Sequence, residues 1–124
     1  MPAVTVRDAT PDDVELLHAL VCELAEYEKL RDAVRATSDS MRAALFGPRP
    51  YCEALVGEID GSPAGFALFF HNYSTFAGKP GIYLEDLYVR EAARGHGLGK
   101  ALFRRVGELA VARDCSRIEW SALD

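Results

Sequence analysis

The stretch Ala93–Leu102 reads ARGHGLGKAL and decides how this chain is interpreted. Glycine stands at every second position from Gly95 to Gly99, and apolar residues at helical spacing follow. Because glycine has no Cβ, backbone amides in such a loop can turn toward a ligand and let it approach closely. A helix behind the loop adds unpaired N–H groups and a partial positive charge, which suit a pyrophosphate. The alternative is an ordinary glycine-rich turn that enters a helix.

Two other glycine-loop motifs fail on residues that their chemistry requires. A Walker A loop needs Ser or Thr after Gly-Lys to hold magnesium, whereas alanine follows Gly99-Lys100. A dinucleotide-binding fingerprint needs glycine at its sixth position, and the sixth residue counted from Gly95 or Gly97 is lysine or leucine. What remains is an Arg-x-Gly-x-Gly type of pattern between a strand and a helix, whose first position is Ala93 or Arg94 depending on the alignment. Arg94 and Lys100 add positive charge at its rim.

The flanking sequence predicts an α/β fold in the order β-α-α-β-β-β-α-β, a mixed sheet with helices packed against it. The predicted helices run from Pro11 to about Leu30, over Ser38–Phe46, and from about Leu98 to Arg113. The predicted strands are Val4–Thr10, Tyr51–Ile59, Pro63–Tyr73, Ile82–Val89 and Ser116–Leu123. Thr10 before Pro11 is a typical helix start, and Asp60-Gly61 is typical of a tight hairpin turn.

Bulk composition narrows the function classes. A chain of 124 residues forms one domain at most, so we expect a single domain over residues 1–124. A net charge of −5 disfavours a nucleic-acid-binding module that works through a basic face. We find no secretion signal and no apolar run of membrane-spanning length, so we expect no membrane partner. Three widely separated cysteines argue against disulfides or a metal site and favour the cytoplasm.

A family resemblance is carried by the segment YLEDLYVREAARGHGLGKALF, Tyr83–Phe103. It resembles motif A of the Gcn5-related N-acetyltransferase (GNAT) superfamily, whose glycine loop binds the pyrophosphate of acetyl-CoA. The segments Glu23–Leu30 (ELAEYEKL) and Gly78–Val89 (GKPGIYLEDLYV) are similar to the diamine (spermidine/spermine) N-acetyltransferase branch. The resemblance covers nearly the whole chain. It implies the GNAT fold and an N-acetyltransferase that uses acetyl-CoA as cosubstrate and needs no metal.

The resemblance also implies residue roles. It assigns main-chain contacts with the pantetheine arm to Leu87, Tyr88 and Val89. It assigns the pyrophosphate to the run Arg94, Gly95, His96, Gly97, Leu98, Gly99 and Lys100, where His96 acts through its backbone. It places a carboxylate that binds or deprotonates the amine at Glu85, and further acceptor contacts at Tyr27, Glu28 and Asp86. The plainer interpretations are sheet core for Leu87 and Val89, and solvated positions for Glu28, Glu85 and Asp86.

The geometry of a strand adds one expectation. Glu85 and Asp86 are adjacent, so a regular strand turns them to opposite faces of the sheet and they do not form a paired dyad. Because an unpartnered buried charge is unfavourable, two consecutive acids within an apolar strand favour a functional role.

The expected reaction is direct attack of a neutral primary amine on the thioester in a ternary complex, with a polyamine, diamine or thialysine-like acceptor. Two alternatives stay open: an acetyltransferase of a protein amine or aminoglycoside, and a non-catalytic acyl-CoA-binding sensor or interaction module. In members of the family, the chain continues beyond the last predicted strand with a helix, whose tyrosine protonates the leaving thiolate, and with two more strands. We therefore expect the chain to be incomplete at its C-terminus, leave the general acid unassigned, and expect a homodimer.

Overall fold

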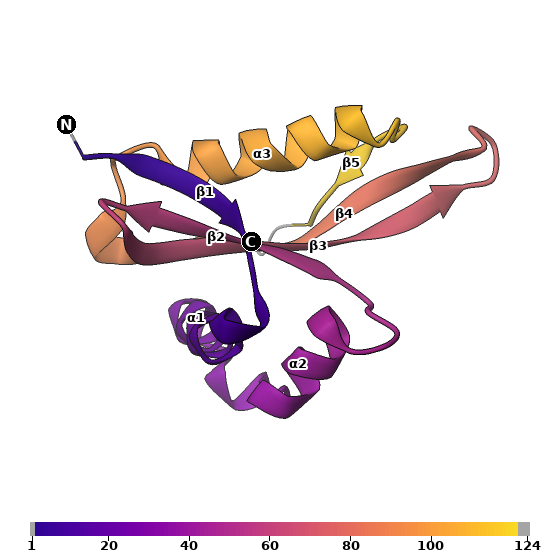
Figure 1. Ribbon diagram of the computed structural model, residues 1–124. Helices are drawn as coiled ribbons and strands as arrows, with labels where there is room; N and C mark the ends of the chain where they lie inside the picture. The colour runs from indigo at the N-terminus through magenta and orange to yellow at the C-terminus, as the bar shows by residue number, and fades with distance from the viewer. Residues whose placement is uncertain (1, 122–124) are drawn as a thin grey trace.

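The computed structural model describes residues 2–121 (Figure 1). It contains three α-helices and five strands in the predicted order, with short 3-10 turns between some of them. The helices are α1 (Val14–Tyr27), α2 (Ser38–Phe46) and α3 (Leu98–Ala112). The strands are β1 (Val4–Asp8), β2 (Glu53–Ile59), β3 (Ser62–Ser74), β4 (Lys79–Val89) and β5 (Ile118–Glu119).

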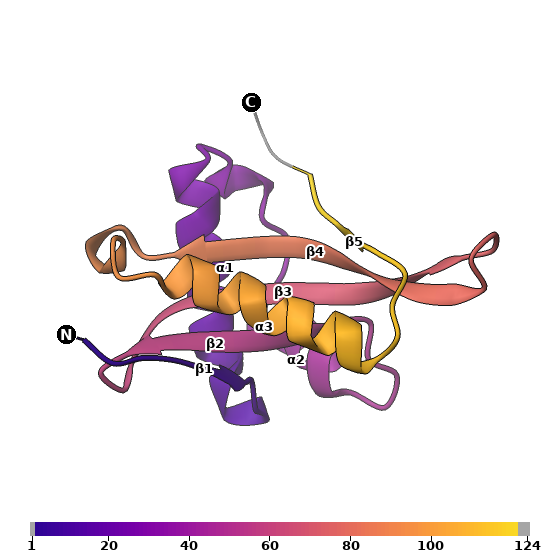
Figure 2. The same ribbon diagram turned by 90° about the horizontal axis from the view of Figure 1, so that it is seen from above.

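The five strands form one mixed sheet whose spatial order follows the chain, β1-β2-β3-β4-β5. The first four strands pair antiparallel, and β5 pairs parallel to β4 after the crossover through α3. Strands β3 and β4 are longer than the sequence predicts and project beyond the rest of the sheet as a hairpin (Figure 2). This sheet confirms the predicted α/β class.

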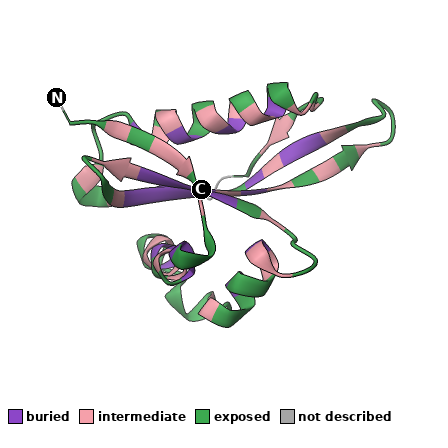
Figure 3. Cartoon of the chain, viewed as in Figure 1, coloured by how far each residue is buried: buried purple, intermediate pink, exposed green. Residues whose placement is uncertain are grey.

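Helices cover both faces of the sheet: α3 lies on one face, and α1 and α2 lie on the other (Figures 1 and 2). Each face therefore has its own apolar core, and burial is concentrated along the central strands and the inward sides of the helices (Figure 3). The core under α3 includes Leu55, Phe69, Ile82, Leu84, Leu98, Leu102 and Val106. The core under α1 and α2 includes Val14, Leu17, Leu20, Met41, Leu45, Val56, Phe66 and Tyr88.

The N-terminal end of the first helix is fixed by a buried carboxylate. Asp13 accepts the Thr10 backbone N–H at 2.7 Å and binds the Arg7 guanidinium through both of its oxygens, at 2.8 and 2.9 Å. These contacts lower the pKa of Asp13 to about 2, chiefly because of the hydrogen bond from Arg7. The helix ends at Tyr27, three residues before the predicted end, because Lys29 adopts a left-handed backbone with φ 61°.

The C-terminal strand is shorter than predicted. Only Ile118 and Glu119 pair with β4, and residues 122 and 123 of the predicted strand lie outside the described residues. In the register, β5 pairs with Ile82 and Tyr83 and with nothing further along β4 among residues 2–121. The part of β4 from Leu84 to Val89 therefore has no strand beside it on the β5 side within the described chain.

A second departure from the sequence prediction lies within β4. Leu84 pairs with Phe69 and Asp86 with Leu68, so Glu85 is an extra residue that interrupts the ladder. This β-bulge reverses the alternation of the strand: Leu84 packs in the core under α3, whereas Tyr88 packs in the core under α1. The expectation that Glu85 and Asp86 face opposite sides is wrong, because that alternation does not run across the bulge.

Candidate functional site

The glycine loop turns into α3 through two residues with left-handed backbone. Gly95 and Gly97 have φ values of 90° and 83°, a region that residues with a Cβ rarely adopt. Gly97 caps the helix, and its carbonyl accepts the first helical hydrogen bond, from Ala101 N–H at 3.0 Å. The N–H groups of Leu98, Gly99 and Lys100 thus precede the first intrahelical bond and are available to a ligand. The helix start is built to receive negative charge.

Gly99 differs from the other two because its backbone needs no special conformation. A Cβ added there meets only Val89 Cγ2, at an ordinary 3.8 Å. The protein therefore does not require glycine at this position for its own packing. The space that a side chain would fill belongs to a cavity.

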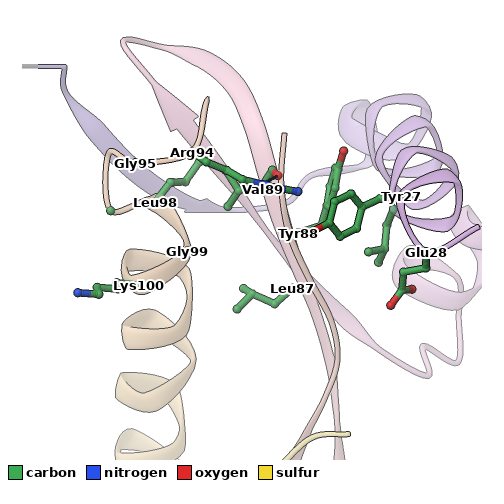
Figure 4. Close-up of a pocket in the computed structure, with 12 residues that line it drawn as sticks. Tyr27, Glu28, Leu87, Tyr88, Val89, Arg94, Gly95, Leu98, Gly99 and Lys100 are labelled. Atoms are coloured by element: carbon green, nitrogen blue, oxygen red, sulfur yellow. Dashed lines mark hydrogen bonds between the residues drawn. The ribbon is translucent and has the colours of Figure 1, made fainter. Parts of the chain in front are cut away.

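That cavity, the glycine-loop cavity, has a volume of about 660 Å³ and lies between the loop, β4 and the end of α1 (Figure 4). Nearly all of the predicted cofactor residues line it. These residues are Leu87, Tyr88, Val89, Arg94, Gly95, Gly97, Leu98, Gly99 and Lys100. Leu24 and Tyr27 of α1, and Glu28 directly after that helix, complete the lining. The exception is His96, which lines a separate small cavity beside Pro63 and Arg90.

Arg94 crosses the glycine-loop cavity from the loop toward α1 (Figure 4). Its Nε donates to the Val89 carbonyl at 3.0 Å, and its guanidinium carbon lies 4.6 Å from the centre of the Tyr27 ring. It lies 6.0 Å from the centre of the Tyr88 ring. The Lys100 side chain, in contrast, extends away from Leu87 and Tyr27 (Figure 4).

The residues present fit acetyl-CoA. The helix start offers free N–H groups for a pyrophosphate, and the unpaired stretch of β4 offers backbone groups to the amide-bearing pantetheine arm. The predicted main-chain role of Leu87, Tyr88 and Val89 stays a prediction, and the open edge of β4 supports it.

A second cavity of about 640 Å³, the acidic cavity, adjoins the first and shares Leu24, Glu28 and Leu87 with it. Glu85 and Asp86 both line it, so the bulge brings together two carboxylates that a regular strand would separate. Tyr27, which the sequence placed with the acceptor residues, lines the glycine-loop cavity and not the acidic one.

Asp86 is affected by burial and by the two other acids. The pKa of Asp86 is raised to about 6, first by burial and then by the negative charges of Glu85 and Glu28. No cation forms an ion pair with Glu28, Glu85 or Asp86 among the residues that the structure describes. A ligand that brings positive charge into this cavity relieves the repulsion.

The sequence analysis missed the aromatic side of the acidic cavity. Phe103 on α3 and Trp120 after β5 line it, and their rings meet edge to face with centroids 5.4 Å apart. Phe103 directly follows Leu102 and so lies beside the apolar face of its helix. Trp120 is an isolated aromatic residue near the end of the last predicted strand. Phe103 ends the segment that resembles motif A but has no role assigned there, and Trp120 lies outside that segment, so only the fold brings the two rings to the acids.

Two properties of the described residues bear on other functions. Within residues 2–121, no group of three or more His, Cys, Asp or Glu side chains is arranged to hold a metal ion. None of the helices in that part of the chain is long and apolar enough to cross a membrane.

Comparison with known proteins agrees with this geometry. Residues 16–124 match the Acetyltransferase (GNAT) family. The chain is 38% identical to thialysine N-epsilon-acetyltransferase of Bos taurus, over 100% of this chain and 77% of that protein. It is 29% identical to L-ornithine N5-acetyltransferase NATA1 of Arabidopsis thaliana, over 96% of this chain and 72% of that protein.

A solved structure has the same fold. An aminoglycoside acetyltransferase from an uncultured soil metagenomic sample, in complex with sisomicin, superposes with a TM-score of 0.81. The alignment covers 98% of this chain and 78% of that one, at 14% identity, so the likeness concerns the fold alone. Since the family match spans most of the chain and the relatives cover 90% of it or more, this protein belongs to the GNAT family of N-acetyltransferases, in its diamine acetyltransferase-like branch.

Proposed function

We propose that this protein transfers the acetyl group of acetyl-CoA to a primary amine of a small, multiply cationic acceptor of the polyamine, diamine or thialysine type. The observation that carries this proposal is the contact between two cavities, one suited to a pyrophosphate and one lined by three carboxylates. An acceptor with two or more ammonium groups matches Glu28, Glu85 and Asp86 in charge. The names of the thialysine and ornithine acetyltransferases support the same class of acceptor.

When bound, acetyl-CoA supplies the activated acyl group for direct transfer in a ternary complex. The chain's own residues have three tasks. The N–H groups at the start of α3 bind the pyrophosphate, and Arg94 adds charge beside them. The carboxylates hold the ammonium groups of the acceptor. Glu85 takes the proton from the attacking amine, directly or through water, and Asp86 lies beside it with a pKa of about 6.

The test is release of free CoA thiol from acetyl-CoA with a panel of amines: spermidine, putrescine, thialysine, lysine and an aminoglycoside. We expect turnover with the small cations, and we expect Glu85→Gln to lower kcat at least tenfold while the affinity for acetyl-CoA stays unchanged. The isosteric exchange keeps the shape of the site. Equal kcat values and pH profiles in the two proteins would remove Glu85 from the mechanism.

The same assay decides between the alternatives. Binding of acetyl-CoA without turnover of any amine would favour an acyl-CoA sensor. Turnover of the aminoglycoside alone would change the acceptor from a small polyamine or diamine to an aminoglycoside. A homodimer and a cytoplasmic location stay predictions of the sequence analysis; the mass of the protein in solution tests the first.

A further inference from the structure

Tyr27 has a position that core packing does not explain. It is the last residue of α1, and it is 61% exposed. Its ring nevertheless lies against the Arg94 guanidinium, with 4.6 Å between the ring centre and the guanidinium carbon. Its hydroxyl has no hydrogen-bond partner among the described residues. The contact with Arg94 is therefore the interaction that accounts for the placement of the ring.

Arg94 is held differently from the other arginines that bridge elements of the fold. Arg7, Arg90 and Arg113 each bind a carboxylate through two nitrogen atoms. Within residues 2–121, the Arg94 side chain has no carboxylate partner, and its only hydrogen bond runs from Nε to the Val89 carbonyl. Its two terminal Nη groups have no protein acceptor in the described chain.

Such an arginine is fixed in place without being neutralised. The Nε hydrogen bond and the ring of Tyr27 fix the plane of the guanidinium, and the Nη groups stay free for an anion. A carboxylate in the position of Tyr27 would hold Arg94 as well but would cancel its charge. An aromatic ring orients the cation and leaves its charge available to the ligand.

Resting on the proposed function, we infer that Tyr27 is a positioning residue for acetyl-CoA: it holds Arg94 across the glycine-loop cavity so that the Nη groups meet the pyrophosphate. Tyr27 thus belongs to the cofactor half of the site, although it is next to the acceptor residue Glu28 in the chain. Its contribution is made through Arg94, so its loss matters only for ligands that carry the phosphates.

The test compares two ligands on isotope-labelled protein by NMR titration: acetyl-CoA, and S-acetylpantetheine, which lacks the pyrophosphate. Tyr27→Ala and Tyr27→Leu should each weaken acetyl-CoA about tenfold, the size expected for a cation–π contact at a partly desolvated site. Both should bind S-acetylpantetheine as the wild type does. Tyr27→Phe should bind both ligands normally, because the ring and not the hydroxyl contacts Arg94. Tyr27→Leu keeps an apolar side chain, so it separates loss of the ring's electrostatics from loss of packing.

The variant Arg94→Met completes the test. It should weaken acetyl-CoA more than Tyr27→Ala does, and adding Tyr27→Ala to it should cause no further loss. Unchanged acetyl-CoA affinity in Tyr27→Ala, equal losses for both ligands, or full additivity with Arg94→Met would each overturn the role of Tyr27. In these cases wild-type binding leaves the proposed function intact. A wild type that binds no acetyl-CoA would overturn both proposals.

Discussion

Asp86 shows how a single residue reports on the charge of the site. Its pKa of about 6 lies above the ordinary value of 3.8, because burial and the charges of Glu85 and Glu28 disfavour the ionised form. The folded protein therefore binds more protons than the unfolded chain between about pH 4 and pH 6. The free energy of unfolding falls as the pH rises through this window. At neutral pH Asp86 is ionised, which lowers the free energy of unfolding but gives the acidic cavity its negative charge.

Removal of this charge should stabilise the protein. We expect Asp86→Asn to unfold at a higher urea concentration than the wild type at pH 7, and the two proteins to converge toward pH 4. The measurement is a set of urea unfolding curves between pH 4 and pH 7. Glu85→Gln serves as the partial control, because it removes one of the two neighbouring charges and should narrow the window. Parallel stability profiles for Asp86→Asn and the wild type would contradict the assigned pKa.

Gly99 allows the cavity itself to be tested with one methyl group. Gly99→Ala introduces no strained backbone and no clash, so stability should stay equal or rise by up to about 1 kcal/mol from helix propensity. Its Cβ projects into the glycine-loop cavity, and the affinity for acetyl-CoA should fall at least fivefold.

The matched control for this exchange is Gly107→Ala in the same helix. A Cβ added there meets nothing within 4 Å, and Gly107 lines neither of the two cavities. Both variants gain the same helix propensity, so only the loss of affinity in Gly99→Ala is specific to the cavity. Equal acetyl-CoA affinities in the two variants, measured by calorimetry, would place the ligand elsewhere.

At the scale of elements, β4 joins the two halves of the site. Its unpaired edge borders the glycine-loop cavity, and the bulge lies at Glu85, which lines the acidic cavity together with Asp86. The helix α3 brings the glycine loop to the end of this strand, and α1 brings Tyr27 and Glu28. A regular strand in place of β4 would separate the two acids, and a longer β5 would cover the open edge.

The element order and the glycine loop follow from local patterns in the sequence, whereas most of the cavity lining follows from the family resemblance of Tyr83–Phe103. Periodicity marks the strands and helices, and the alternating glycines mark the helix start. The bulge at Glu85 was missed because it depends on the register between Leu68 and Phe69 of the neighbouring strand. Trp120 and Phe103 were missed for the same reason, since their contact joins α3 to the segment after β5. The contact between Tyr27 and Arg94, on which the proposed role of Tyr27 rests, joins α1 to the glycine loop and therefore also depends on the fold.

The start of α3 is positioned from below by β2. Gly57 lies directly under Leu98, and a Cβ there would come within 2.7 Å of the Leu98 side chain, which is only 2% exposed. We expect Gly57→Ala to displace the first turn of α3. The result should be a loss of about 1–3 kcal/mol in unfolding free energy together with weaker acetyl-CoA binding.

The double variant Gly57→Ala/Leu98→Ala provides the check on this explanation. Shortening Leu98 removes the clash, so the two exchanges should be less destabilising together than the sum of their separate effects. Urea unfolding of the single and double variants measures the coupling. Simple additivity would show that Gly57 and Leu98 do not share the contact.

The whole molecule is a twisted sheet with a separate apolar core on each face, and the site lies where the two layers meet at the edge of β4. The layer under α3 supports the glycine loop, and the layer under α1 supports the acidic side. This arrangement keeps the positive helix start and the three carboxylates in adjoining cavities of one small protein. Their proximity matches a reaction between an anionic cosubstrate and a cationic acceptor.

The most direct test of this account is a map of backbone amide shifts during titration with acetyl-CoA, followed by addition of spermidine. The account predicts that acetyl-CoA first shifts the amides of residues 87–89 and 94–100. Spermidine should then shift residues 84–87 together with Glu28. Shifts confined to other surfaces, or spermidine shifts away from Glu28, Glu85 and Asp86, would contradict the division of the site into a cofactor cavity and an acidic acceptor cavity.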